Sequence, residues 1–548
     1  MSVSRVVIPV LDLEQNDDPH SKVVLKGAKQ ISLQRIQASS ATVSEATFNW
    51  QPPSQNTVID RRIDLVAKFR VSLPTLTFKD KFVAANNAIV TDGNAGTGSL
   101  ATVGYPELVV GQGAYAANPP TTTGNAHAAT GQATMMRVGN NFALRQFPLQ
   151  TVTDNIDLTL NGTHFSTDPA NYVKAVSQYM SPEYREQVFK ATAHHPDTYA
   201  GEYVDAFKTA NQNKYMGCSN SLSRTFGSGR NGESPNALFL NDDATGGLFK
   251  TTVNATAMTL DFELREPLMI SPLCANYGKG MTNINNIDVA IKFKNAISKL
   301  FCYFANDDSD FSQTTGTLPL DLADITDNIS LVENSAFLEV RNYTAQDDIK
   351  IPNEIILPYH QPRRFETDAS AATTAGANQS AITSNRRLDQ IPECVYLWVA
   401  EKRSIITNAN APSKTDGMFQ PTNVSISWGN QVGILSGFTA NQLFELAVEN
   451  GCDLVDYNEA RVKGYCLKLV FGKDIPLMDN ESAGTRGDYN IVVEITSRNG
   501  SVKDITSTFT DMYVNLGQVI VSPNECRVQT GLLDLKDNIE ALTIKDKI

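Results

Sequence analysis

Alternation of apolar and polar residues at every second position dominates this chain. Two segments show the pattern most clearly. They place on one face the apolar residues Met258, Leu260, Phe262 and Leu264, and then Ile287, Val289, Ile291 and Phe293. A period of two is typical of a strand that buries one face. The same pattern predicts strands at residues 23–36, 64–73, 336–343, 394–401, 464–471, 489–496 and 512–521. Helical periodicity is scarce, so the sequence predicts a mainly antiparallel β protein of the sandwich or barrel type.

Two helices are expected within this β pattern. The first is expected over residues 169–180. Asp168 is its possible N-cap, and a proline, Pro169, occupies the first helical position. The second, over residues 440–450, has Thr439 three residues before Gln442, which is a capping-box spacing. A helix after a strand is unusual in a β-rich chain, so it serves as a marker for comparing distant parts of the sequence.

The order of strand, glycine-containing turn and helix occurs twice, about half the chain apart. Phe147 lies 25 residues before Tyr172, and Phe419 lies 25 residues before Phe444. Sequence identity between the two units is low. We interpret them as two copies of one β domain with a helix at an equivalent place. The alternative is a coincidence between two common strand–turn–helix patterns.

This repeat and the polar stretches predict the domain organisation. The expected parts are an N-terminal extension (1–19), a first β domain (20–304), a polar linker (305–325), a second β domain (326–530) and a C-terminal tail (531–548). Long loops are expected at 83–140 and 195–255, with a shorter one at 365–385. Loops of this length are usually functional, and we expect them on the outer surface.

Charge and cysteine content narrow the class of protein. The net charge is −13 and neither terminus carries a run of Lys or Arg, so tight direct binding of nucleic acid is not expected. No apolar run is long enough to span a membrane, and the first residues do not read as a secretory signal. The seven cysteines, at 218, 274, 302, 394, 452, 466 and 526, are odd in number and widely spaced. We interpret them as reduced, mostly buried thiols of a protein made in the cytosol or nucleus, with a disulfide framework as the weaker alternative.

Metal-binding patterns are incomplete. His194 and His195 are adjacent, but Cys218 is the nearest thiol and no third ligand has a suitable spacing. The acidic stretch 306–310 lacks the glycine and glutamate of an EF-hand loop. We interpret the histidines as surface or interface residues and the acidic stretch as a solvated linker.

Nucleotide-binding and catalytic patterns are also incomplete. The Gly-Lys-Gly at 278–280 is not a P-loop, because Leu273 stands where the first glycine is required. Residues 227–232 match GxGxxG, but they lie in a polar loop without the flanking strand and helix. Possible glycosylation sequons begin at Asn161, Asn254, Asn342 and Asn423, and they carry little weight without a secretory signal. The sequence therefore predicts no catalytic, cofactor-binding or metal-binding residues.

Three stretches carry a resemblance to a known family: residues 143–162, residues 264–293 and the repeated strand–helix unit. The most specific part is Glu266–Leu273 followed by Asn283–Ile287. Here the chain resembles the double jelly-roll major capsid proteins of Polinton-like viruses and virophages, in the adenovirus–tectivirus lineage. The resemblance implies two tandem eight-stranded jelly-roll β-sandwiches, each with an inserted short helix and long surface loops.

The resemblance also implies a function. Such a protein is a structural, non-enzymatic subunit of the virion, made in the host cytoplasm or nucleus without a cofactor. Its partners are itself in a homotrimer, neighbouring capsomers, and penton and other minor capsid proteins. Trimers form pseudo-hexagonal capsomers that tile an icosahedral shell. The missing basic arm fits, because such capsids are often lined by a membrane or by minor proteins.

Two other classes of protein remain open at this point. A single jelly-roll capsid protein of an RNA virus commonly has a basic N-terminal arm, which is absent here. A non-viral carbohydrate-binding or adhesin β-sandwich normally has a signal peptide, and often paired cysteines or an aromatic platform. Trp50, Trp398 and Trp428 are too scattered to suggest that platform. An enzyme is disfavoured because no catalytic set of residues is present.

Overall fold

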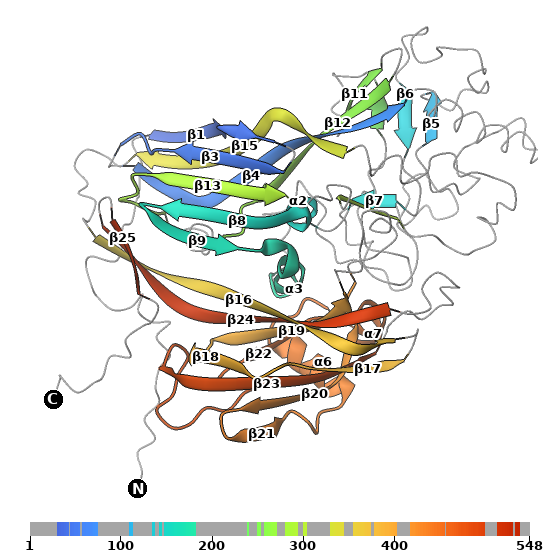
Figure 1. Ribbon diagram of the computed structural model, residues 1–548, viewed down its shortest axis with the longest axis vertical. Helices are drawn as coiled ribbons and strands as arrows, with labels where there is room; N and C mark the ends of the chain where they lie inside the picture. Colours follow the sequence, from blue (N-terminus) through green and yellow to red (C-terminus); the bar gives the residue numbers. More distant parts are fainter. Residues whose placement is uncertain are drawn as a thin grey trace, which may run out of the picture.

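Two β-sandwiches, roll 1 and roll 2, are stacked along the long axis of the molecule in the computed structural model (Figure 1). The structure describes residues 30–42, 44–54, 57–74, 109–112, 134–137, 142–144, 147–181, 238–240, 249–253, 257–270, 280–293, 300–303, 329–344, 354–373, 377–402, 417–454, 456–498, 512–529 and 532–536. All neighbouring strands in the sheets of both rolls are antiparallel, as the period-two pattern predicts.

Roll 1 consists of two facing sheets. One has the strand order β1-β15-β4-β12-β11, and the other has the order β2-β3-β13-β8-β9. The strands of the first sheet are β1 Gln30–Gln37, β15 Ile329–Thr344, β4 Thr57–Pro74, β12 Ala257–Pro267 and β11 Phe249–Val253. Those of the second are β2 Ser40–Ala41, β3 Glu45–Trp50, β13 Ile287–Phe293, β8 Thr153–Leu160 and β9 Thr163–Thr167.

Roll 2 repeats this arrangement. Its first sheet has the order β16-β24-β19-β22, with β25 also paired to β24, and its second has the order β17-β23-β20-β21, with β18 also paired to β23. The strands of the first sheet are β16 Glu354–Thr373, β24 Met512–Gln529, β19 Cys394–Glu401, β22 Leu467–Val470 and β25 Leu532–Lys536. Those of the second are β17 Asn378–Ile382, β18 Arg386–Gln390, β23 Arg486–Arg498, β20 Gln420–Trp428 and β21 Gln431–Ile434.

The strand orders of the two rolls correspond place by place. In the first sheets, β16, β24, β19 and β22 take the places of β1, β15, β4 and β12. In the second sheets, β23, β20 and β21 take the places of β13, β8 and β9. Each roll thus interleaves early and late strands in the same way, which is the topology of a jelly roll. The predicted fold class, two tandem jelly-roll β-sandwiches, is confirmed.

The last strand of roll 1 lies later in the sequence than we expected. Strand β15 pairs with β1 along its length and also with β4, where Leu338 lies opposite Leu65. The expected start of the second domain at residue 326 is therefore wrong, because these backbone pairs place β15 in the first sheet. Roll 2 begins with β16, so the boundary lies between Thr344 and Glu354.

The helices occupy equivalent connections in the two rolls. In roll 1, η3 Pro169–Asn171 and α3 Val173–Ser177 lie between β9 and β12. In roll 2, α6 Ala440–Glu449 and α7 Tyr457–Lys463 lie between β21 and β22. The predicted equivalence is confirmed. The equal 25-residue spacings that motivated this prediction do not connect equivalent residues. Helix α2 Pro148–Val152 separates Phe147 from β8, whereas Phe419 directly precedes β20.

The two helix starts differ from each other. At Thr439 the predicted capping box is confirmed, since the Gln442 amide donates to the Thr439 hydroxyl and the Gln442 side chain accepts from the Thr439 amide. The continuous helix expected over residues 169–180 is wrong, because a short 3₁₀ turn and a five-residue α-helix replace it. Asp168 forms no capping hydrogen bond there.

Several expected loops contain strands. Strands β5 Val109–Gln112 and β6 Thr134–Arg137 pair with each other, and β6 pairs with β10 Leu238–Leu240, so the two long segments share a small sheet. Two short strands, β7 Phe142–Leu144 and β14 Phe301–Tyr303, form a further pair. The loop expected at 365–385 is wrong for most of its length, because β16 continues to Thr373 by pairing with β24 and β17 covers Asn378–Ile382. The tail expected from 531 begins with β25, another strand of that sheet.

Each roll has an apolar interior. The four residues predicted on one face of β13, from Ile287 to Phe293, are all buried. In roll 2, the helix residues Leu443 and Phe444 share one core cluster with Phe419. This core explains why an amphipathic helix follows an edge strand, because α6 packs against β20 and β22.

Candidate functional site: the contact between the rolls and the outer face of roll 1

The outer face of the first sheet of roll 2 is apolar and covered. Outward-facing residues of β19 and β24 form one buried cluster with Tyr172 and Ala175 of the roll 1 helix segment. These sheet residues are Cys394, Tyr396, Trp398 and Val519. The intervening residues of β19 face the core of roll 2. Strand β19 is therefore buried on both faces, which is why its sequence is an almost continuous apolar run.

A glycine allows the sheet to hold Trp398. Trp398 lies directly opposite Gly517 on β24. A Cβ atom at Gly517 would lie 2.3 Å from Cε2 of the Trp398 ring, well inside van der Waals contact. The absence of a side chain here lets the indole lie flat over the neighbouring strand, where it forms part of the floor that receives roll 1.

The helix segment of roll 1 also satisfies the free edge of that sheet. The Cys466 amide donates to Oε1 of Gln178 over 2.8 Å. The Tyr179 hydroxyl donates to the Cys466 carbonyl over 2.7 Å and accepts from the Lys468 amide over 2.8 Å. Strand β22 is the last in the order β16-β24-β19-β22. Side chains from roll 1 thus take the place of a neighbouring strand, and they protect an edge that would otherwise be open to pairing.

Two further contacts join the rolls beside this cluster. Asp168 accepts a hydrogen bond from Nη1 of Arg364 on β16 over 2.7 Å, and both side chains are partly buried. The rings of Phe165 on β9 and Tyr359 on β16 meet edge to face, 6.2 Å apart. Figure 1 shows β9 and α3 of roll 1 directly above β16 and β24 of roll 2. The Arg364 pair explains why Asp168 does not cap the helix.

Burial raises the pKa of the thiol and phenol groups in this contact. Loss of solvent raises the pKa of the Cys394 thiol from 9.0 to about 12, and it raises the pKa of Cys466 well above its ordinary value. The pKa of Tyr179 is also raised well above 10, mainly by burial. These three groups stay neutral at physiological pH, so none of them acts as a thiolate nucleophile or a base.

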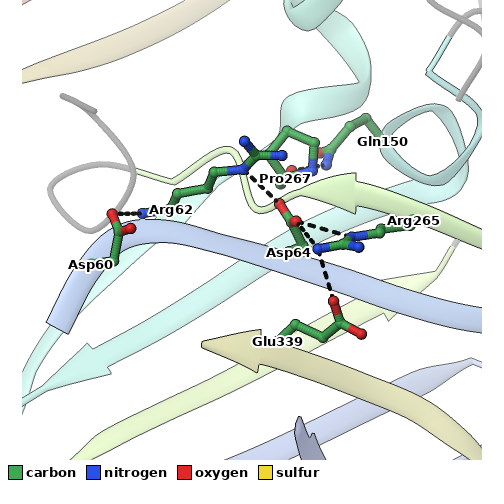
Figure 2. A network of polar contacts seen from close by, with 7 residues as sticks. All are labelled: Asp60, Arg62, Asp64, Gln150, Arg265, Pro267 and Glu339. Atoms are coloured by element: carbon green, nitrogen blue, oxygen red, sulfur yellow. Dashed lines mark hydrogen bonds and ion pairs between the residues drawn. The ribbon is translucent and has the colours of Figure 1, made fainter. Parts of the chain in front are cut away.

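The outer face of the first sheet of roll 1 has a different character. Figure 2 shows a network in which Arg265 contacts Asp64 over 2.7 Å and Glu339 over 2.8 Å, with Arg62 near Asp64 at 3.4 Å. Arg35 of β1 extends it toward Glu339 at 3.7 Å. Arg265 and Arg35 are about half exposed, so solvent screens these pairs and each contributes little to stability. This face is charged, whereas its counterpart in roll 2 is apolar.

The motif that carried the family resemblance has a structural role. Glu266 points into roll 1 and is fully buried, and its two oxygens accept from the amides of Leu149 and Gln150, each over 2.9 Å. The Gln150 side chain returns a hydrogen bond to the Pro267 carbonyl over 2.8 Å (Figure 2). Glu266 thereby fixes the N-terminal turn of α2, which leads into β8.

The second part of that motif is held by Asn161. The Asn161 side chain donates to the Asn283 carbonyl over 3.0 Å and accepts from the Asn285 amide over 2.7 Å. Both Asn161 and Asn283 have a positive φ, which asparagine tolerates better than most residues. The asparagine side chains of three predicted sequons are engaged in the fold, since Asn342 donates to Gln34 and Asn423 donates to the Ser436 carbonyl.

Several residues and stretches that the sequence analysis considered fall outside the described residues. These are His194, His195, Cys218, Asn254 and the stretches 227–232 and 306–310. Within the described residues, no group of three or more His, Cys, Asp or Glu side chains could hold a metal ion. No helix in that same part of the chain is long and apolar enough to cross a membrane.

One glycine and three cysteines that the sequence analysis considered lie in closely packed parts of the fold. A Cβ at Gly280 would lie 2.2 Å from Cγ1 of Val58, so this glycine permits close packing against β4. The cysteines whose side chains are described, Cys394, Cys452 and Cys466, are buried and form no disulfide within the described residues. For these three the predicted burial is confirmed.

Sequence reasoning did not identify Gln178, Tyr179 and Glu266 as contact residues. Tyr179 falls within the helix predicted over residues 169–180, and the structure shows that this segment docks on the other roll. One available signal was the run from Cys394 to Val399, because a strand apolar at every position must be covered on both faces.

Two solved structures share this fold. A chain in the 3.5 Å cryo-EM structure of the Sputnik virophage matches with a TM-score of 0.70 and 18% identity, over 100% of this chain and 96% of that chain. The mavirus major capsid protein matches with a TM-score of 0.58 and 13% identity, over 98% of this chain and 96% of that chain. Together with the repeated strand order, these matches define the fold as that of a double jelly-roll capsid protein.

Sequence families identify the group within that class. The model of the Sputnik virophage major capsid protein first domain matches residues 5–105 and 107–334, more than half of the chain. The model of the major capsid protein V20 C-terminal domain matches residues 362–459. The chain belongs to the Sputnik virophage major capsid protein family. The "Putative capsid protein V20" of Sputnik virophage is 22% identical over 99% of this chain and 82% of that relative.

Family membership settles the broad function. The protein is a viral major capsid protein and its place is the virion. The resemblance to virophage capsid proteins is confirmed, and the single jelly-roll and adhesin alternatives are wrong for this chain. Its role is structural.

Proposed function

We propose that three copies of this chain form a pseudo-hexagonal capsomer, and that such capsomers tile an icosahedral shell. The observation that carries the proposal is the repeated strand order of the two rolls. A subunit with two similar rolls gives a trimer six similar walls, and six walls can contact six neighbours. Further partners are neighbouring capsomers and the penton and minor capsid proteins.

The proposal includes two absences. The protein carries out no reaction, which is supported by the burial and neutrality of the Cys394, Cys466 and Tyr179 groups at the roll contact. It does not bind nucleic acid tightly by itself, which is supported by the net charge of −13. Filter binding with duplex DNA tests the second point, and salt-resistant binding near nanomolar affinity would contradict it.

The oligomeric state tests the proposal as a whole. Light scattering on the purified protein at micromolar concentration should give three times the chain mass of 59.8 kDa. A stable monomer at that concentration would overturn the trimer, because each roll would then leave its outer strands uncovered.

A further inference from the structure

Strand β25 leaves one edge of the first sheet of roll 2 open. Strand β24 pairs with β16 on one side over Met512–Gln529. On its other side β24 pairs first with β19, as far as Val521, and then with β25, from Glu525 onward. The last part of β24 is therefore the middle strand of a three-stranded ribbon, β16-β24-β25. Among the described residues, no strand pairs with the outer edge of β25.

The register of this ribbon places apolar residues together on one face. Residues directly opposite each other in antiparallel strands share a face of the sheet. Two successive rows on one face are apolar in all three strands. The residues of these rows are Ile355, Val528 and Leu533, and then Leu357, Cys526 and Leu535. Both rows end at the outer edge of β25, so a strand added there would extend an apolar face.

The opposite face of the ribbon carries charged residues at the same edge. Asp534 on β25 lies opposite Arg527 on β24, and Lys536 lies opposite Glu525. An acidic and a basic residue therefore flank Leu535 along the outer edge of β25. If a second β25 pairs antiparallel with this edge and is centred on Leu535, each Asp534 lies opposite Lys536 of the other copy. Across the four strands the charges then alternate in sign, which favours the pair.

A second copy of the chain is the occupant that this edge fits. Open strand edges pair readily with another strand, and soluble proteins normally protect them. The edge of β25 is complementary to itself, both in its charged positions and in its central leucine, and a self-complementary contact has a two-fold axis. A capsomer of three subunits has no two-fold axis within it. The pair therefore joins subunits of two different capsomers.

We propose that β25 of one subunit pairs with β25 of a subunit in a neighbouring capsomer, antiparallel and centred on Leu535, so that two three-stranded ribbons become one six-stranded ribbon. Figure 1 shows β25 at the opposite end of the molecule from β5 and β6. Capsomers that stand side by side in a shell with the same orientation therefore present their β25 edges at the same level. This inference rests on the proposed tiling of capsomers and adds which strand joins two of them.

Disulfide formation tests the pairing and its register. The variant Leu535→Cys, made together with Cys526→Ser to remove the thiol opposite it, should form covalent dimers of the chain under mild oxidation, above the level of Cys526→Ser alone. Leu533→Cys with Cys526→Ser is the matched control. Leu533 shares a face with Leu535, but the proposed register separates it from Leu533 of the other copy by four residues, roughly 14 Å, which is too far for a disulfide. Equal cross-linking in the two variants, or none in Leu535→Cys, overturns the inference.

Truncation tests whether β25 is needed for association between capsomers. A chain that ends at Gln529 lacks β25, and the matched control, which ends at Lys536, keeps it. Light scattering should show that the control trimers associate further, as the full chain does. Trimers of the chain that ends at Gln529 should need a protein concentration about tenfold higher or more. Equal association of the two truncated chains contradicts the role of β25, as does a full chain whose trimers do not associate at all.

The two proposals can fail separately. If the full chain is a trimer and the Leu535→Cys cross-link is absent, the capsomer stands and only this contact is wrong. If the full chain is a monomer that cross-links through position 535, the capsomer fails and the contact between two copies stands. If truncation at Gln529 prevents folding, the cross-link alone decides, because the Leu535→Cys and Leu533→Cys variants retain every strand.

Discussion

The Tyr179 hydroxyl is the smallest group whose removal tests how the two rolls are joined. Its oxygen lies 2.7 Å from the Cys466 carbonyl oxygen and 2.8 Å from the Lys468 amide nitrogen. The variant Tyr179→Phe keeps the ring, which lies 5.4 Å from the ring of Tyr396. It removes the only atom through which Tyr179 makes these two hydrogen bonds.

The free-energy cost of Tyr179→Phe comes from the backbone groups that lose their hydrogen-bond partner. A buried backbone group that loses its partner costs roughly 1–3 kcal/mol. If only the Lys468 amide is left without a partner, opening of the edge strand should become easier by that amount. Since 1.4 kcal/mol is a factor of ten, amide exchange at Lys468 should accelerate on the order of 10- to 100-fold.

Tyr465→Phe is the matched control. Tyr465 is fully buried in the core of roll 2, and among the described residues its hydroxyl has no hydrogen-bond partner. Removing that hydroxyl should leave stability unchanged or slightly higher. Hydrogen exchange by mass spectrometry over residues 464–471, together with the melting temperature, compares the two variants. Equal behaviour of the two would refute the view that Tyr179 stabilises the edge of β22.

Three other predictions concern the described core. Glu266→Gln should lower the stability of roll 1 by about 1.5–3 kcal/mol in denaturant unfolding, because an amide can accept from only one of the two α2 amides; an unchanged midpoint would contradict this role. Gly517→Ala should cost about 1–3 kcal/mol or reduce soluble yield, because the new Cβ would meet the Trp398 ring at 2.3 Å; a melting temperature equal to that of the parent would show that the ring can move. The Cys394 pKa rises on folding from 9.0 to about 12, so the unfolded thiol ionises first as the pH rises. Its contribution to stability is complete below pH 9 and is lost between pH 9 and about 12. A melting temperature that stays constant across the lower part of that window would contradict burial of the thiol.

Local sequence patterns predicted the elements that depend on local chemistry. The alternation in β13 predicted its buried face, because strand side chains point to opposite sides at every step. The capping box at Thr439 predicted the start of α6, because both of its hydrogen bonds lie within four residues. The repeat of strand, turn and helix predicted two domains of one topology.

Pairings between distant segments could not be read in this way. Strand β15 lies after a polar stretch, and only its hydrogen bonds to β4 and β1, hundreds of residues earlier, assign it to roll 1. The far end of β16 is rich in Ala, Ser and Thr, so it looked like a loop, but its backbone pairs with β24. Asp168 looked like a helix cap, and its partner Arg364 belongs to the other roll. In each case a long-range contact overrode the local preference.

Electron microscopy of the purified protein tests the central claim most directly, namely that this capsid subunit contributes two similar rolls to a trimer. The account predicts uniform particles with a hexagonal outline, in which three subunits of 59.8 kDa supply six walls. Particles that contain one chain each, or rings with a number of walls other than six, would contradict it.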